Sequence, residues 1–213
     1  LFSNIVIQKI IETLRPLSSN KNANYYEYIE KTMSCLDEEQ KVFLEPLEGR
    51  RQKYFEGLAG TGKTLILEYS SLKSANENPE KKILFLTFNK LISARIKADM
   101  DQKNPEENIK VIAIYELVKE IIMEKEENLE REEEDAEREG TEDKFWGNLP
   151  IRAINILNQY PDLSERYSFD EIYIDEGQDI IKEKNEAILD FLDEVTKNGL
   201  KGGSWMIAAD FHQ

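Results

Sequence analysis

The sequence has little of what covalent cross-linking or membrane insertion would require. Cys35 is the one cysteine among 213 residues, which excludes an intramolecular disulfide and fits a reducing compartment. No apolar run approaches the roughly 18 residues that a membrane-crossing helix needs. The opening residues, LFSNIVIQKIIETL, contain neither a basic leader nor a cleavage site. We therefore expect a cytoplasmic protein without a membrane partner.

Basic residues are also scarce. There are 28 Lys and Arg against 43 Asp and Glu, a formal net charge of −15. A uniformly acidic surface would repel DNA or RNA. The excess is local, however, because residues 124–144 contain 12 acidic and 4 basic side chains. The rest of the chain is only mildly acidic, and a basic groove there is compatible with a screening length of about 8 Å.

What the sequence does have is an alternation of short apolar strands and helical runs from Leu36 onward. This pattern predicts an α/β fold, a mostly parallel sheet with helices on both faces. The expected strands are Lys53–Glu56, Lys82–Thr87, Lys110–Ile114, Glu171–Asp175 and Ser204–Ala209. The expected helices are Thr64–Leu72, Leu91–Met100, Tyr115–Lys125, Leu149–Gln159 and Lys184–Lys197.

Two segments stand outside this alternation. Residues 1–35 predict an N-terminal helical extension, with a helix that stops at Arg15 or Pro16, a loop over residues 18–22 and a second helix over Tyr25–Met33. A charged insert at about residues 124–148 interrupts the domain of residues 36–213. It predicts either an exposed helix held by ion pairs four residues apart or a disordered loop. The sequence is compatible with two roles for this insert, a solvated structural face or a docking site for a basic partner.

The segment GLAGTGKT, residues 57–64, has the pattern G-x-x-x-x-G-K-[ST] between a predicted strand and a predicted helix. Glycines let the backbone curl around an anion, so that N–H groups and the helix N-terminus point at phosphates. A lysine near the β and γ phosphates and a hydroxyl that binds Mg²⁺ complete the loop. The alternative is a glycine-rich turn that only caps a helix. The residues expected to bind ATP are Gly57, Gly60, Thr61, Gly62, Lys63 and Thr64.

A second acidic motif, EIYIDEGQD, occupies residues 171–179. A strand with Ile172 and Ile174 on one face would deliver Asp175 to the carboxyl edge of the sheet, where ligands bind in open α/β folds. Asp175, with Thr64, is then a candidate Mg²⁺ ligand, and Glu176 a candidate general base. Two adjacent acids at a strand end can also simply begin a loop.

With these residues in hand, the chain resembles the UvrD/Rep-like branch of superfamily 1 helicases, in the first RecA-like domain of that family. The resemblance rests on LDEEQ (residues 36–40), TFNK (87–90), DEGQD (175–179) and ADFHQ (209–213). It implies that Gln40 pairs with adenine and that Gln213 senses the γ phosphate as a catalytic residue beside Lys63 and Glu176. It also implies nucleic-acid contacts at Thr87, Phe88, Asn89 and Tyr115. The chain departs from the family at Ala209, where the family usually has glycine. It also departs at residues 113–115, where the family usually has Thr-aromatic-His and this chain keeps only the aromatic ring of Tyr115.

The resemblance implies an ATP- and Mg²⁺-dependent motor domain for single-stranded DNA or RNA. The chain begins with Leu1, which suggests a longer polypeptide, and the second RecA-like domain with its transition-state arginine is not within it. Such arginines contribute on the order of 10³–10⁵ in rate, so we expect slow hydrolysis. A rival hypothesis is an ATP-dependent regulatory or sensing module of a nuclease or defence protein, fused or bound, that unwinds nothing. A small-molecule kinase is disfavoured.

Overall fold

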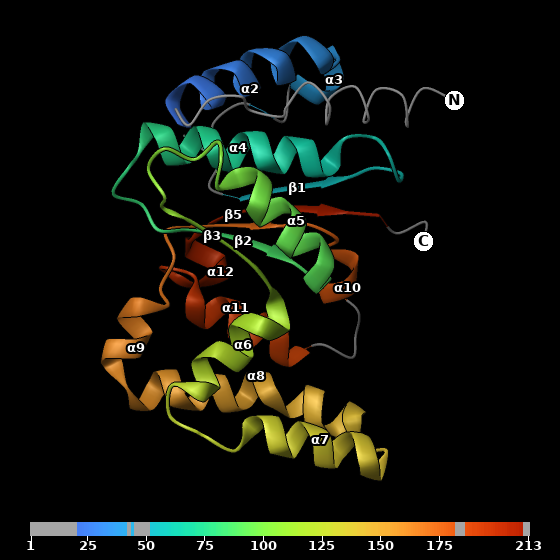
Figure 1. Ribbon diagram of the computed structural model, residues 1–213, viewed down its shortest axis with the longest axis vertical. Helices are drawn as coiled ribbons and strands as arrows, with labels where there is room; N and C mark the ends of the chain where they lie inside the picture. The colour runs from blue at the N-terminus through green and yellow to red at the C-terminus, as the bar shows by residue number, and fades with distance from the viewer. Residues whose placement is uncertain (1–20, 42–43, 45–51, 182–185, 211–213) are drawn as a thin grey trace.

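Five parallel strands form one sheet in the computed structural model, which describes residues 21–41, 44, 52–181 and 186–210 (Figure 1). The strands stand in the order β1-β5-β4-β2-β3. They are β1 (Gln52–Glu56), β2 (Ile83–Thr87), β3 (Ile109–Ala113), β4 (Glu171–Ile174) and β5 (Ser204–Ala209). Each predicted strand lies within one residue of an observed one. The parallel register puts all five carboxyl ends at one edge.

Helices cover both faces of this sheet, as predicted. The helices are α2 (Lys21–Cys35), α3 (Glu38–Lys41), α4 (Lys63–Glu77), α5 (Lys90–Met100), α6 (Ile114–Met123), α7 (Leu129–Glu139), α8 (Glu142–Gln159), α9 (Pro161–Arg166), α10 (Gln178–Ile181), α11 (Glu186–Val195) and α12 (Gly199–Gly202). In Figure 1, α2 and α4 lie on one side of the sheet, and α6, α8 and α11 on the other. No described helix has the length and apolar character that crossing a membrane requires.

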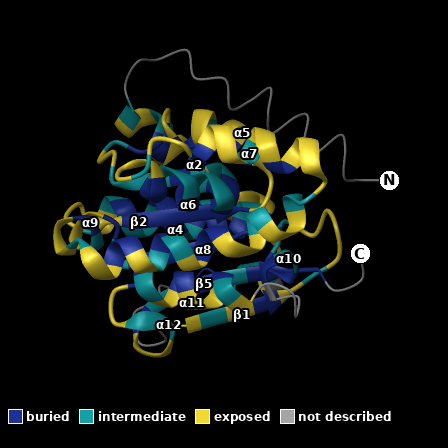
Figure 2. Ribbon diagram, turned by 90° about the horizontal axis from the view of Figure 1, so that it is seen from below, coloured by how far each residue is buried: buried dark blue, intermediate teal, exposed yellow. Residues whose placement is uncertain are grey.

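The side-chain alternation of the strands divides the core between the two faces. On β2, Ile83 and Phe85 join the cluster under α4 and α5, whereas Leu84 and Leu86 join the cluster with α6, α8 and α11. Because both faces are covered, β2 is buried along its whole length (Figure 2). A strand buried on both sides reads as a continuous apolar run, which is the pattern of a central parallel strand.

Helix α2 packs onto α4. Tyr25 and Tyr28 form a buried cluster with Leu72 of α4, so this part of the N-terminal segment shares the core of the sheet domain. The predicted loop over residues 18–22 is wrong at its end, because Lys21 already begins α2. The cause is that burial of the tyrosines outweighs the low helix propensity of the polar residues beside them. The predicted helix ending at Arg15 or Pro16 lies outside the described residues.

The charged insert forms a helical hairpin of α7 and the first turns of α8. Arg152 of α8 makes ion pairs with Glu126 and Glu132, and Lys119 of α6 pairs with Glu133 at 2.5 Å. Of the two alternatives, the helix is therefore the observed one. The expected start of the next helix at Leu149 is wrong, because α8 begins at Glu142 and contains Pro150 in its interior. Proline normally favours a first turn, so the sequence pattern misplaces the start.

Candidate nucleotide-binding site

The glycine-rich loop between β1 and α4 has the backbone that the motif predicts. Gly60 and Gly62 take φ values of 81° and 86°, in the left-handed region that favours glycine. A Cβ at Gly57 would lie 2.6 Å from Thr61 Oγ1. The glycines thus allow a curl that a side chain would prevent. Helix α4 begins directly after it at Lys63, so its unpaired N–H groups open into the loop.

Lys63 lies inside this curl. Its ammonium donates hydrogen bonds to the carbonyl oxygens of Gly57, at 2.7 Å, and Leu58, at 3.1 Å. The same nitrogen lies 3.8 Å from a carboxylate oxygen of Asp210, which is buried after β5. A buried lysine held by backbone carbonyls is available to a phosphate, because a phosphate oxygen makes a stronger, charge-assisted bond to it.

Thr64 and Asp175, the two predicted Mg²⁺ ligands, are in direct contact although 111 residues separate them. The Thr64 hydroxyl donates a hydrogen bond of 2.6 Å to Asp175 Oδ2. Burial raises the pKa of Asp175, the hydroxyl bond opposes the shift, and the neighbouring Glu176 carboxylate adds to it. Parallel pairing brings the ends of β1 and β4 to one edge, with β5 between them.

These donors fit a hard divalent cation. Among the described residues there is no group of three or more His, Cys, Asp and Glu arranged to hold a metal. A hydroxyl and one carboxylate instead suit Mg²⁺, which usually takes one or two protein ligands and completes its shell with phosphate oxygens and water. The pair therefore matches a cation that arrives with a nucleotide.

Glu176 begins a tight turn out of β4. Its φ of 56° is unusual for a residue with a side chain, and such strain is found at functional sites. The next residue, Gly177, donates its N–H to Ala208 O at 2.7 Å. A Cβ at Gly177 would lie 2.4 Å from a methyl carbon of Ile207, so only glycine fits. This turn directly follows Asp175, and the separate tasks of Asp175 and Glu176 stay a prediction.

Gln178, to which the sequence alone assigned no role, contacts two residues of the candidate site. Its side-chain nitrogen donates to Glu176 Oε2 at 2.7 Å, and its oxygen accepts the N–H of Asp210 at 2.9 Å. One buried amide therefore joins the end of β4 to the end of β5. The signal was present in the spelling DEGQD, but it takes the adjacency of β4 and β5 to show which groups the amide connects.

The predicted adenine-reading element lies against the glycine-rich loop. Asp37 and Gln40 exchange hydrogen bonds between side chain and backbone N–H at 2.9 and 2.8 Å, which caps the short helix α3. The Gln40 side-chain nitrogen also donates to Thr61 O at 2.8 Å. Gln40 is thus next to the candidate phosphate site, while its contact with a base stays a prediction.

The four predicted nucleic-acid contacts lie at the ends of β2 and β3. Thr87 is only 1% exposed, and its hydroxyl donates to Asn89 O at 2.9 Å. The Asn89 side chain accepts N–H groups of the first turn of α5, so both side chains shape the loop. Phe88 is 37% exposed and meets Tyr115, whose pKa is raised by burial. Contact with nucleic acid through these residues stays a prediction.

The structure brings Gln40, the glycine-rich loop, Asp175 and Glu176 to one edge of the sheet. Gln213, the predicted γ-phosphate sensor, lies outside the described residues. No curated protein matched the chain. The family model described as "Type III restriction enzyme, res subunit" matches residues 5–200. The chain therefore belongs to the type III restriction enzyme res-subunit family, a family of helicase-type P-loop ATPase domains, as its parallel sheet and loop geometry also indicate.

Proposed function

We propose that this chain is the first RecA-like domain of a superfamily 1 helicase or translocase of the UvrD/Rep type. It binds MgATP at the carboxyl edge of the sheet and hydrolyses it. The observation that carries the proposal is the 2.6 Å contact between Thr64 and Asp175. It joins the two motifs that a P-loop motor needs at one point, with Lys63 on one side and Glu176 on the other.

Each residue has a chemical task in this proposal. Backbone N–H groups of residues 57–64 and the Lys63 ammonium bind the β and γ phosphates. Thr64 and Asp175 hold Mg²⁺, which when bound neutralises charge on the phosphates. Glu176 takes a proton from a water that attacks the γ phosphorus, and the bond to the β-γ bridging oxygen breaks to give ADP and phosphate. Gln178 positions the Glu176 carboxylate through its 2.7 Å hydrogen bond.

The strand-binding part of the proposal concerns the loops after β2 and β3. We propose that single-stranded DNA or RNA lies across Phe88 and Tyr115, with phosphate and stacking contacts that depend little on sequence. A second RecA-like domain closes on the nucleotide and supplies an arginine to the transition state. Closure of the two domains then couples ATP hydrolysis at the end of β4 to movement of the single-stranded nucleic acid.

The name of the family gives one alternative. A restriction enzyme is a nuclease, so the family description fits an ATP-dependent regulatory or sensing module of a nuclease, one that unwinds nothing. Stimulation of hydrolysis by single strands favours the motor. Nucleotide-dependent nuclease activity without such stimulation favours the module.

Single-turnover hydrolysis with the enzyme in excess over labelled ATP tests the catalytic assignment. We expect hydrolysis that is slow but measurable, and Glu176→Gln to lower the rate by roughly 10²–10⁴-fold, because the water loses its base. Binding of a fluorescent ATP analogue should change little. Glu137→Gln on the exposed face of α7 is the matched control.

Two results would contradict the proposal. Equal hydrolysis rates in Glu176→Gln and Glu137→Gln would remove Glu176 as the base. A turnover near one per second by this chain alone would mean that no second domain is needed for the transition state.

A further inference from the structure

Four aromatic rings form a continuous row at the carboxyl edge of the sheet, and two of them, Phe88 and Tyr115, are predicted nucleic-acid contacts. Phe88 after β2 meets Tyr115 of α6, with ring centroids 5.9 Å apart. Tyr115 meets Trp146 of α8 at 5.2 Å, and Trp146 meets Phe145 at 5.4 Å. Three segments that are distant in sequence therefore present one aromatic surface, and its second half belongs to the α7–α8 hairpin.

Packing holds the rings in place, and each ring is partly exposed to solvent. Tyr115, Phe145 and Trp146 are half-buried and pack against the core cluster under α6 and α8. Each pair meets edge to face, at interplanar angles of 77° to 82°. A ring that is already fixed loses little conformational freedom when a base stacks on it, and it offers a large apolar area.

Cationic groups accompany the row. Lys119 lies 5.6 Å from the centre of the Trp146 ring, where Glu133 also holds it. The side chain of Lys90 is 73% exposed and pairs with Glu116 at 3.1 Å. Glu116 follows Tyr115 in the first turn of α6. A phosphate can compete for such an exposed pair, since surface pairs contribute at most about 1 kcal/mol.

Acidic residues limit long-range attraction at the same place. Glu142 and Asp143 lie in the first turn of α8 and Glu116 in that of α6. The mixed charge favours a ligand whose binding depends on stacking more than on counterion release. Bases of a flexible single strand, with a phosphate that reaches the exposed Lys90, meet both conditions.

We propose that Trp146 is a base-stacking residue that extends the single-strand path from Phe88 and Tyr115 onto α8. The inference rests on the proposed function and adds a contact that no motif of the chain assigns. The hairpin that carries most of the acidic excess thereby also contributes to the strand-binding surface. The role of Trp146 is to hold one further base beyond Tyr115.

The two tryptophans allow a direct test. Trp205 is the second residue of β5, at the opposite edge of the sheet, and donates its ring N–H to Leu200 O at 2.8 Å. In a Trp205→Phe variant, emission reports on Trp146 alone. We expect an oligothymidylate to quench this emission saturably, whereas Trp146→Phe, which keeps Trp205, shows no quenching.

Affinity is measured separately, by anisotropy of the labelled oligothymidylate. Trp205→Phe should bind like the wild type, while Trp146→Ala should lose about 5- to 100-fold in affinity, the range for loss of one stacked base. Trp146→Phe should lose less, because a smaller ring remains. Circular dichroism shows whether each variant is folded, and if Trp146→Ala is not, Trp146→Phe and the quenching decide.

The outcomes separate the inference from the proposal beneath it. An oligothymidylate that binds without quenching Trp146, and equally well to Trp146→Phe, overturns the inference but leaves the motor reading intact. If the wild type binds no oligothymidylate, with or without an ATP analogue, the strand-binding part of the proposed function falls and the inference with it. Single-turnover hydrolysis tests the ATP site in either case.

Discussion

Strand β4 has an acidic residue at each end, and the two differ in what they contact. At the amino end both oxygens of the buried Glu171 are occupied, one by Lys81 at 2.8 Å and one by the Tyr173 hydroxyl at 2.9 Å. At the carboxyl end, Asp175 accepts hydrogen bonds from the Thr64 hydroxyl and the Glu176 N–H. The Lys63 ammonium donates to two backbone carbonyls and lies near Asp210. Protein partners hold both oxygens of Glu171 at the amino end, whereas in the proposed function a phosphate and a cation replace the partners of Lys63 and Asp175 at the carboxyl end.

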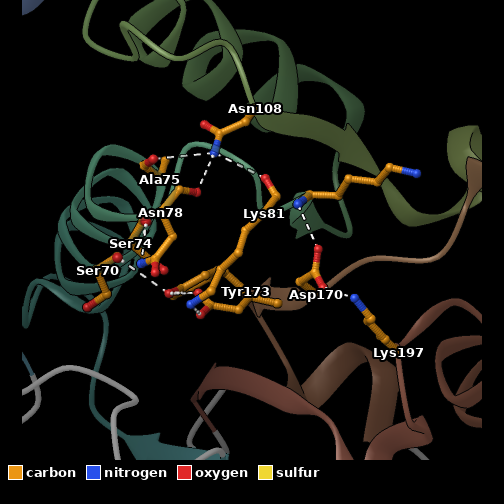
Figure 3. A network of polar contacts seen from close by, with 11 residues as sticks. Ser70, Ser74, Ala75, Asn78, Lys81, Asn108, Asp170, Tyr173 and Lys197 are labelled. Carbon is orange, nitrogen blue, oxygen red and sulfur yellow. Dashed lines mark hydrogen bonds and ion pairs between the residues drawn. The ribbon is translucent and has the colours of Figure 1, made fainter.

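Further polar contacts lie around Lys81 and Tyr173, the two partners of Glu171 (Figure 3). Asn108 donates to carbonyl oxygens in the chain between α4 and β2, including Asn78 at 3.2 Å and Lys81 at 3.1 Å. Although burial raises the pKa of Asp170, its hydrogen bonds from Lys197 and the N–H of Lys82 lower it below the usual value. Polar residues there stabilise the fold by hydrogen bonds and ion pairs between segments. The same residue types form a ligand site only where their partners are exchangeable.

The largest expected effect separates binding from stability at the carboxyl end. Lys63→Ala removes the charge that faces the phosphates, and we expect the affinity for a fluorescent ATP analogue to fall about 100-fold or more, roughly 3 kcal/mol. The melting temperature without nucleotide should change little, because the lost hydrogen bonds are to loop carbonyls and the Asp210 carboxylate, at 3.8 Å, is too far away for a hydrogen bond. Lys73→Ala on the same helix is the control. Unchanged affinity in Lys63→Ala would contradict the proposal that the carboxyl end of the sheet binds the phosphates.

The opposite result is expected at the amino end. Glu171→Gln leaves Lys81 with a weaker partner and removes a charged acceptor from Tyr173, so we expect a loss of about 1–3 kcal/mol in the free energy of unfolding. Urea denaturation measures this loss, and Glu80→Gln, exposed nearby, is the control. Affinity for the ATP analogue should stay within twofold of wild type. A stable variant with weakened ATP binding would reverse the assignment of the two ends.

A smaller, pH-dependent effect is expected between the ends, at Glu68 on α4. Burial raises the pKa of Glu68 to about 7, against the attraction of Lys103. An acid whose pKa is raised by folding stabilises the fold fully below its unfolded pKa, near 4.5, and this contribution is lost as the pH rises through about 7. Glu68→Gln removes the titrating group. Its unfolding free energy should therefore match wild type near pH 5 and exceed it by about 1 kcal/mol at pH 8.

Urea denaturation at the two pH values checks this expectation. Glu77→Gln, exposed on the same helix, should show the same pH dependence as the wild type. A Glu68→Gln variant that is less stable than wild type at pH 8 would show that the charge of Glu68 is needed in the fold, through Lys103 or through the Tyr28 hydroxyl 3.4 Å away.

Local patterns were enough for much of the fold and for part of the site. The strand limits followed from apolar runs because β2 and β4 are buried on both faces. The loop ending in Lys63 followed from its glycines, whose positive φ values are a local requirement. The start of α8 did not follow, since Pro150 resembles a first-turn residue, whereas α8 begins at Glu142 and packs against α6, α7 and α11.

By itself, the sequence determined which residues are candidates for binding phosphate, binding a cation or transferring a proton, because these properties belong to single side chains and short loops. The tertiary structure alone decided which of them meet. The placing of β5 between β1 and β4 brings Gln178 to Asp210, and packing of α8 beside α6 brings Trp146 to Tyr115. Such contacts join segments tens of residues apart, and strand order and helix packing, which act over the whole chain, determine them.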